Sequence, residues 1–357
     1  MRKLNRDIGS SFYELLEDDR EFNLLKQNKV DLKFKYSCYY SGRNALLAIL
    51  ARVANKQSIN TIWLPNYYCD TVINLVQNNF NNVKYYSINP FEFDSELDIS
   101  AFTKQNDIII VNNFWGLSSF NYINRSKERP IIIEDHSHGW LSNQSLNSDA
   151  DYCFCSLRKT YPIPLGSIIW KPNSKETINY FETAEDQEIM NSLNKFSKSM
   201  SLKRFFIKNG ENHLKEEYLE LLNEGEELLN VSNSYIKPKE KLINQLENYI
   251  CLNSNPIKEK HLKYIFAHLS KSEHFKIIQR EGFTPFGLLL LFKDKSMFKS
   301  LKVHLISNQI YPAHLWPHNE TSTAWKYLFN IHVDFRYDIE DMCYLVEKIN
   351  IWSKNNV

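Results

Sequence analysis

Glycine is scarce in this chain, which has only nine glycines among its 357 residues. Loops that cradle nucleotide phosphates need several closely spaced glycines, because only glycine lets the backbone approach the phosphates so closely. No segment of the chain has the glycine spacing of a Walker A loop. The scarcity of glycine therefore argues against a P-loop nucleotide-binding protein.

A charge excess and long apolar runs are missing as well. The formal net charge is +1, so there is no bulk electrostatic attraction to nucleic acid or to an anionic membrane. No stretch approaches the ~18 consecutive apolar residues that suggest a membrane-spanning helix, and we expect no membrane insertion. The segment from Met1 to Asp7 carries charges with no apolar run behind it, which is unlike a signal peptide. We expect a cytoplasmic protein.

Closely paired cysteines are also absent. The six cysteines are scattered, and no two of them form a CxxC pair. Cys153 and Cys155 are two residues apart in an apolar segment, so we interpret them as small core residues on one face of a strand. Such cysteine usage fits a reducing, cytosolic compartment.

What is present is a regular alternation of apolar strands and amphipathic helices in the first half of the chain. The length is enough for about two domains of ~150 residues each. Short buried strands are predicted at 61–64, 82–86, 107–111, 130–133, 152–155 and 167–170, and helices at 43–53, 70–79 and 97–104. This alternation predicts an α/β fold, a mostly parallel sheet flanked by helices. Ligands of such sheets bind beyond the C-terminal strand ends.

The second half of the chain changes in character. A helical region rich in Lys, Glu and Leu covers residues 183–231 and is followed by shorter, mixed elements. Helices are predicted at 242–248, 258–271, 295–307 and 338–352, and strands at 287–292 and 327–332. We therefore predict a large domain of residues 1–235 and a smaller C-terminal α+β domain of residues 236–357.

Two neighbouring strand ends carry residues that favour one cofactor. Asp135 closely follows the apolar run at 130–133, and Lys159 closely follows the next strand. A lysine amine can form a Schiff base with the aldehyde of pyridoxal 5′-phosphate (PLP), and a carboxylate can face its pyridinium nitrogen. A carboxylate placed beside the core is costly to bury unless it is paired, and a pyridinium would pair it. We predict a PLP site with Lys159 and Asp135 as catalytic residues.

A cofactor phosphate needs an anion site near that lysine. Ser41, Gly42 and Arg43 open an amphipathic helix, where free N–H groups and the helix dipole favour an anion. Arg43 could add a charge-assisted contact. Ser156, three residues before Lys159, could add a hydroxyl. Taken alone, Ser41 is better explained as an ordinary N-cap than as part of an anion site.

The segment from Glu134 to His138 admits two interpretations. In the first, His138 donates a hydrogen bond to the phenolic oxygen of PLP or stacks nearby. In the second, Asp135, His136 and His138 bind zinc or iron, as in some metal-dependent hydrolases. No further His, Asp or Glu cluster follows closely in the sequence, so we favour PLP and expect no metal.

In chain order, these segments resemble those of the DegT-type sugar aminotransferases, which are PLP enzymes of fold type I. The matching segments are Ser41-Gly-Arg-Asn-Ala-Leu46, Pro65-Asn-Tyr-Tyr-Cys-Asp-Thr71, Asn112-Asn-Phe-Trp-Gly116, Glu134-Asp-x-x-His138, Ser156-Leu-Arg-Lys159 and His332-Val-Asp-Phe-Arg-Tyr337. The resemblance covers nearly the whole chain. It implies that Asp135 binds the pyridine nitrogen and that His138 lies near the phenolic oxygen. Tyr68, or Cys69 at the family's stacking position, would cover the ring.

The same resemblance implies a function. An amino acid donor such as glutamate would supply an amino group to a keto sugar nucleotide, for surface polysaccharide (O-antigen) synthesis. Lys159 would carry the proton during transfer, and two subunits of a homodimer would share each site. Family members that act as sugar dehydratases have histidine in place of the lysine, so Lys159 disfavours that activity. Three alternatives stay open: a PLP enzyme with an amino acid or other non-sugar substrate, a PLP-fold binding or regulatory protein, and the metal-dependent hydrolase.

Overall fold

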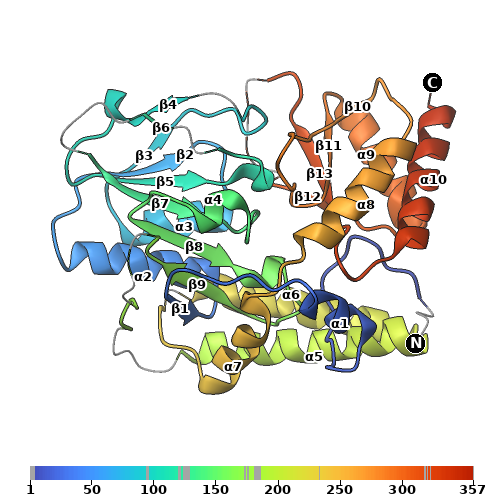
Figure 1. The fold of residues 1–357 in the computed structure, drawn as a ribbon, viewed down its shortest axis with the longest axis horizontal. Helices are drawn as coiled ribbons and strands as arrows, with labels where there is room; N and C mark the ends of the chain where they lie inside the picture. The colour runs from blue at the N-terminus through green and yellow to red at the C-terminus, as the bar shows by residue number, and fades with distance from the viewer. Residues whose placement is uncertain are drawn as a thin grey trace.

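The larger of the two main sheets holds the strands predicted in the first half of the chain (Figure 1). The computed structural model describes residues 5–93, 96–119, 122–123, 129–172, 174, 177–180, 186–232, 234–316, 319, 321 and 323–356. In this sheet the strand order is β1-β9-β8-β7-β5-β2-β3. The bounds are β1 (Tyr36–Tyr39), β2 (Ile62–Pro65), β3 (Val83–Tyr86), β5 (Ile108–Asn112), β7 (Ile131–Asp135), β8 (Tyr152–Ser156) and β9 (Ser167–Trp170).

The direction of the strands confirms a mostly parallel sheet. The strands β3, β2, β5, β7 and β8 run parallel to one another, whereas β9 runs antiparallel to β8 and to β1. The edge strand β1 is not predicted from the sequence. It pairs with β9, which is more than a hundred residues away along the chain.

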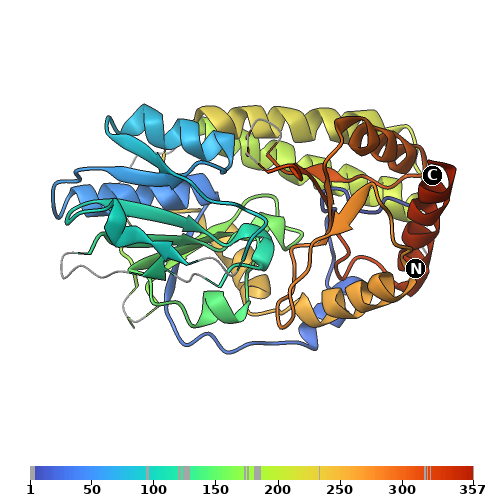
Figure 2. The same ribbon diagram turned by 90° about the horizontal axis from the view of Figure 1, so that it is seen from above.

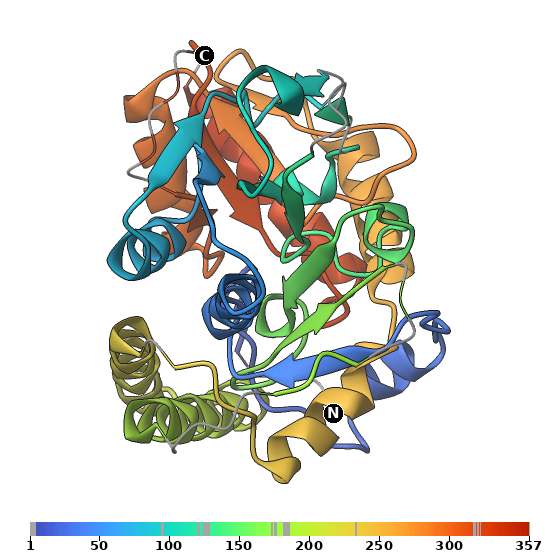
Figure 3. The same cartoon turned by 90° about the vertical axis from the view of Figure 1, so that its left-hand side faces the viewer.

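Helices and buried side chains cover both faces of this sheet. On one face, α2 (Gly42–Ala54) and α3 (Asp70–Asn79) pack their apolar residues against Ile110 and Ile133. Figure 3, seen from the end of this sheet, shows both helices on the same side of the strands. On the other face, α7 (Glu240–Ile250) packs against a core that includes Ile132, Cys153 and Cys155. The interpretation of both cysteines as buried core residues is confirmed.

One predicted helix is wrong. Residues 97–104 form the short strand β4 (Leu97–Asp98), which pairs with β6 (Tyr122–Ile123), and the 3₁₀ turn η1 (Ile99–Ala101). The Asp98 carboxylate accepts hydrogen bonds from the backbone N–H and the hydroxyl of Ser100. Local bonds of this kind offer the backbone an alternative to a continuous helix.

The smaller sheet is antiparallel, with the order β10-β11-β13-β12. Its strands are β10 (Phe275–Ile277), β11 (Leu288–Phe292), β12 (Ala313–His314) and β13 (Tyr327–Ile331). Three helices, α8 (Asn255–His268), α9 (Lys295–Ser307) and α10 (Ile339–Asn355), contribute to the core on one face. On the other face, Leu289, Leu291 and Leu328 pack against Tyr67 and Trp115 from loops of the larger sheet. Since β11 is buried on both faces, its sequence is apolar throughout.

Two long helices lie along both sheets. The helices α5 (Gln187–Asn209) and α6 (Leu214–Val231) run side by side below the larger sheet and on toward the smaller one (Figures 1 and 2). They confirm the predicted helical region, which is interrupted at Gly210; residues 183–185 of that prediction lie outside the described residues. None of the described helices is long and apolar enough to cross a membrane.

The division of the chain between residues 235 and 236 stays a proposal. The helix α7 lies after that division in the sequence, yet Leu242 and Leu246 of α7 belong to the core beneath the larger sheet. The short segments η2 (Phe114–Gly116) and η3 (Leu157–Lys159) position residues of the candidate site, and the short helix α4 (Asn143–Leu146) lies between β7 and β8 in the sequence. The helix α1 (Arg20–Lys26) precedes β1 in the sequence.

Candidate active site

The C-terminal ends of β5, β7 and β8 meet at one edge of the larger sheet. In the strand register, Asn112 of β5 lies opposite Asp135 of β7, and Asp135 lies opposite Phe154 of β8. Two residues later β8 ends at Ser156, and η3 follows with Lys159 as its last residue. The Leu157 N–H donates to the Gly166 carbonyl oxygen over 2.9 Å, which closes the turn. The parallel strands therefore bring Asp135, Ser156 and Lys159 to the same edge.

Lys159 and His138 face one another at this edge. Their Nζ and Nε2 atoms are 3.4 Å apart. An ammonium group has only donors, so with Lys159 charged the imidazole accepts at Nε2 and carries its proton on Nδ1. That Nδ1 atom is buried and has no hydrogen-bond partner among the described residues. Burial lowers the pKa of His138 well below its usual value, and the charge of Lys159 lowers it further.

Asp135 is a buried carboxylate without a cation. Its side chain is 6% exposed, and no described Lys, Arg or His forms an ion pair with it. Oδ1 accepts the Ser137 N–H over 2.8 Å, and Oδ2 accepts the Tyr68 hydroxyl over 2.7 Å. A carboxylate offers about four lone-pair positions, so Asp135 can accept a further donor. An uncompensated buried charge is costly, so pairing with a cationic ligand would stabilise the Asp135 carboxylate.

Ser156 and the first turn of α2 lie against one another. A Cβ atom built on Gly42 would lie 3.2 Å from Ser156 Cβ and 3.8 Å from Ser156 Oγ. No described residue bonds to this hydroxyl, while the Ser156 N–H donates to Ser137 Oγ over 3.0 Å. The Ser41 hydroxyl accepts the Asn44 N–H and is the N-cap of α2. The helix start and a free hydroxyl therefore lie side by side, as an anion site requires.

Charged side chains surround this helix start. Arg158 makes a two-pronged ion pair with Glu226 of α6, over 2.7 and 3.0 Å. Burial alone would raise the pKa of Glu226, but Arg158, followed by Arg43 and Lys159, keeps it below its usual value. Arg43 does not point freely into the anion site, because its guanidinium donates to Asn230. Burial, with the charge of Arg158 added, lowers the Arg43 pKa.

Aromatic rings enclose His138. Trp115 stacks on the imidazole with centroids 5.4 Å apart, and Phe286 lies at 4.5 Å. Trp316, from the segment after β12, is tilted over the same imidazole at 5.5 Å. Tyr67 directs its hydroxyl to the Leu315 carbonyl oxygen over 3.3 Å. Cys69 is the half-buried N-cap residue of α3. Aromatic rings from segments next to both sheets therefore line the site.

The described residues contain no metal-ligand cluster made of Asp135, His136 and His138. The metal-ligand group found among the described residues is Glu134, His136 and Cys153, which includes neither Asp135 nor His138. His136 bonds to Glu134 over 2.9 Å, and both side chains are buried. Burial, with the nearby Glu134, raises the pKa of the Cys153 thiol well above its usual value. A protonated thiol is a poor metal ligand, so this group does not form a ready metal site.

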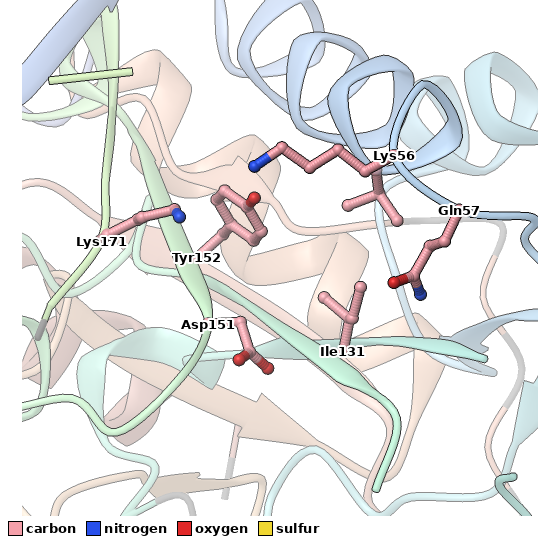
Figure 4. A pocket seen from close by; sticks show the side chains of 7 residues that line it. Lys56, Gln57, Ile131, Asp151, Tyr152 and Lys171 are labelled. Carbon is pink, nitrogen blue, oxygen red and sulfur yellow. The ribbon is translucent and has the colours of Figure 1, made fainter. Parts of the chain in front are cut away.

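Two surface hollows lie outside the cluster of Asp135 and Lys159. One, of about 200 Å³, is at the opposite ends of the strands, where Ile131 and Tyr152 begin β7 and β8 (Figure 4). There the amines of Lys56 and Lys171 point toward the ring of Tyr152 (Figure 4). The other, of about 180 Å³, lies beside α4 and the start of α8. Neither is lined by Asp135 or Lys159.

These observations fit PLP in three respects. A buried carboxylate lacks a cation, a buried imidazole nitrogen lacks a partner, and a lysine amine points at that imidazole. A pyridinium, a phenolic oxygen and an aldehyde are the groups of PLP that would match them. The helix start beside Ser156 would match the phosphate. Each polar group of the cofactor therefore has a potential partner among these residues.

Comparison with known proteins identifies the fold. No family model and no curated protein matches the chain. Among solved structures, Spr1654 of Streptococcus pneumoniae, described as a sugar aminotransferase in its PLP form, matches with a TM-score of 0.61 and 12% identity, covering 98% of this chain and 100% of that one. PseC of Helicobacter pylori, an aminotransferase of pseudoaminic acid biosynthesis, matches with a TM-score of 0.59 and 11% identity over 98% and 100% of the chains. A DegT DnrJ EryC1 StrS aminotransferase of Brucella abortus matches with a TM-score of 0.55 and 12% identity over 96% and 91%. This chain has the fold of the sugar aminotransferases.

In this aminotransferase fold, several residues of the site are not among those predicted from the sequence. Trp115 lies in a segment that the resemblance includes, but its stacking on His138 is not predicted. Trp316 and Asn319 carry no signal in the sequence, because they reach the site only when the smaller sheet packs on the larger one. Tyr68 is predicted as a ring cover, which stays a prediction, and the hydrogen bond from its hydroxyl to Asp135 is not predicted from the sequence.

Proposed function

We propose that this chain is a PLP-dependent aminotransferase that transfers an amino group from an amino acid, such as glutamate, to a keto sugar nucleotide. The observation that supports it most is the convergence of Lys159, His138 and Asp135 at the C-terminal edge of a parallel sheet. The sugar aminotransferase fold supports the same conclusion. Fold alone does not determine a substrate, so the sugar is the part of the proposal that needs its own experiment.

Each residue of the candidate site would have a role that follows from its position. Bound PLP would supply an aldehyde that takes up the amino group and a protonated ring that withdraws electrons. Lys159 would hold the cofactor and move the proton at the reacting carbon, as a general base and acid. Asp135 would keep the ring nitrogen protonated, and the Nδ1–H of His138 would donate to the phenolic oxygen. The helix start at Gly42 and the Ser156 hydroxyl would hold the phosphate.

The first experiment tests the cofactor. The purified full-length chain mixed with PLP should absorb near ~420 nm, and borohydride should abolish the band and fix a pyridoxyl group on Lys159. Mass spectrometry of the peptides identifies the lysine. The Lys159→Ala variant is the control and should show no fixed adduct. An adduct on a different lysine, or stoichiometric zinc or iron without PLP, would overturn the assignment.

A second experiment tests the substrate. The protein is loaded with pyridoxamine phosphate, and keto sugar nucleotides and 2-keto acids are offered separately. Return of the band near ~420 nm with a keto sugar nucleotide supports the proposal. Rapid turnover of one amino acid without a response to any sugar would indicate a non-sugar PLP enzyme. Bound PLP with no response to any donor would indicate a binding or regulatory protein.

The proposal includes a homodimer with shared active sites, as the resemblance implies. The chain mass is 42.3 kDa, so sedimentation of the purified protein should show a species of twice that mass. A monomer that is fully active at assay concentration would contradict this part of the proposal only.

A further inference from the structure

Tyr68 makes a contact that a ring-stacking residue would not make. Its side chain is fully buried, and its hydroxyl donates to Asp135 Oδ2 over 2.7 Å. Burial raises the pKa of the Tyr68 phenol well above its usual value, and the charge of Asp135 raises it further. The phenol therefore stays protonated and acts as a donor to the carboxylate. With the Ser137 N–H on Oδ1, both carboxylate oxygens have a fixed donor.

Tyr68 is itself held from the segment between β12 and β13. The Tyr68 N–H donates to Asn319 Oδ1 over 2.6 Å, and Asn319 Nδ2 donates back to the Tyr68 carbonyl oxygen over 2.8 Å. The edge of the Trp316 ring meets the Tyr68 ring with centroids 5.8 Å apart. Trp316 has a φ of 51°, which is uncommon for a bulky residue and is often found at functional sites. This segment therefore restricts both the backbone and the ring of Tyr68.

We propose that Tyr68 is a positioning residue for Asp135, and that Asn319 positions Tyr68. This inference rests on the proposed function, because its purpose is to aim the carboxylate at a pyridinium. A carboxylate with a fixed donor on each oxygen cannot rotate freely, and its remaining lone pairs point in set directions. Tyr68 would thus act through Asp135 and would not cover the ring. The small-domain segment would thereby help to set the geometry of a carboxylate on the larger sheet.

The direct test compares two neighbouring tyrosines. Tyr68→Phe removes the hydroxyl that reaches Asp135, whereas Tyr67→Phe removes a hydroxyl that reaches only the Leu315 carbonyl oxygen. The dissociation constant of PLP is measured by equilibrium dialysis on the cofactor-free protein. Tyr68→Phe releases the Asp135 carboxylate from its set orientation. Because a well-aligned hydrogen bond to a charged group is worth about tenfold or more in affinity, a misaligned contact with the pyridinium should weaken PLP binding about tenfold. Tyr67→Phe should change it by less than about threefold.

A double-mutant cycle separates positioning from packing. Tyr68→Phe is repeated in an Asp135→Asn background, where the charge that it positions is absent. We expect Tyr68→Phe to change the PLP dissociation constant by less than about threefold in that background. An equal loss in both backgrounds would show that Tyr68 matters only for packing and would overturn the inference. An unchanged dissociation constant after Tyr68→Phe alone would overturn it as well.

Two further measurements keep the outcomes distinct. If the wild-type chain binds no PLP, the proposed function fails together with this inference; if it binds PLP and Tyr68→Phe binds equally well, only this inference fails. Circular dichroism confirms that each variant is folded. Should Tyr68→Phe not fold, Asn319→Ala serves in its place, because it releases Tyr68 and keeps the phenol. It should weaken PLP binding severalfold, and unchanged binding would contradict the role of Asn319.

Discussion

At the scale of single residues, the candidate site contains a buried carboxylate that has no cation and a buried imidazole that has one unpaired nitrogen. Asp135 is a buried carboxylate with two neutral donors and no cation among the described residues. His138 has one nitrogen directed at Lys159 and one with no partner in the described part of the chain. Buried polar groups in native proteins are nearly always paired. The unpaired nitrogen of His138, together with the Asp135 carboxylate that lacks a cation, therefore indicates a ligand with complementary chemistry.

The charge of Asp135 is the first property to test at this scale. Asp135→Asn keeps the size and the shape of the side chain but loses the charge, so a bound pyridine nitrogen would no longer stay protonated. We expect PLP to bind still, through the helix start and Ser156, while turnover falls about 10²–10³-fold, as for a lost electrostatic contact to the reacting group. Steady-state kinetics with saturating PLP measures this. Turnover within a factor of about two of the wild type would show that another group does this work.

The Ser156 hydroxyl is the second feature to test at this scale. It lies against the first turn of α2 and has no partner among the described residues. Ser156→Ala should weaken PLP binding about tenfold, because one hydrogen bond to a charged group is lost, while kcat at saturating PLP should change little. The matched control is Ser137→Ala, which removes the acceptor of the Ser156 N–H without removing the Ser156 hydroxyl. Equal PLP affinity of Ser156→Ala and the wild type would mean that the phosphate is held elsewhere.

At the scale of elements, the turn that carries Lys159 depends on its contact with α7. The η3 turn is closed by the hydrogen bond from the Leu157 N–H to the Gly166 carbonyl oxygen. Gly166 has a φ of 154°, and a Cβ atom there would lie 2.2 Å from Leu246 Cδ2 of α7. The position of the lysine is therefore linked to a helix that is distant in the sequence.

This linkage can be tested with two glycines. Gly166→Ala should destabilise the protein by about 1–3 kcal/mol or more, because the added methyl group overpacks a filled space. Gly282→Ala is the control, since Gly282 also has a positive φ, of 78°, but no atom lies within 4 Å of its built Cβ. It should cost about 1–2 kcal/mol from backbone strain alone, and Gly166→Ala should cost more than that. Urea unfolding measures both variants, and a Gly166→Ala variant as stable as Gly282→Ala would contradict the packing argument.

At the scale of the whole molecule, buried charges join the N-terminal segment, α5 and the loop after β13. Asp7 pairs with Lys203 of α5 over 2.8 Å, and the Arg336 guanidinium donates to the Ser10 and Ser11 carbonyl oxygens. Arg336 also pairs with Asp334. Although burial raises the Asp334 pKa, Arg336 outweighs it and lowers the pKa to about 2. These contacts connect parts of the chain that are far apart in the sequence.

His332, in the same loop, should make the stability of the whole protein depend on pH. Burial, with the charge of Arg336 added, lowers its pKa from 6.5 to about 3. The unfolded chain therefore binds a proton below pH 6.5 that the folded chain does not bind, so stability is full above that pH and falls as the pH decreases toward about 3. Between pH 6.5 and pH 5 we expect a loss of about 1–2 kcal/mol from His332. Urea unfolding at several pH values measures this loss.

The matched variant is His332→Phe. Phe12 and Phe286 already contact this ring, so a phenyl group suits the surroundings, and it cannot be protonated. Its stability should fall less steeply between pH 6.5 and pH 5 than that of the wild type. Some slope should persist, because the pKa of buried His138 is lowered in the same direction. Identical slopes in the two proteins would show that His332 does not contribute.

The sequence by itself determined the features that depend on neighbouring residues. The apolar runs specified the strands of the larger sheet, and the alternation with helices specified their parallel order. Asp135 and Lys159 follow those runs directly, so their place at the sheet edge was predictable. The Ser41 cap was predictable for the same reason, because a cap is a contact within one turn of the helix.

Only the tertiary structure decided what those residues touch. Tyr68 meets Asp135 across 67 residues of sequence, and Asn319 meets Tyr68 across 251. No local pattern records such contacts, because they form only when segments that are distant in the sequence pack together. The edge strand β1 was missed for a similar reason, since a four-residue strand is specified by its partner as much as by its own sequence. The chain therefore encodes its sheet locally, while packing of the smaller sheet on the larger one completes the walls of the candidate site.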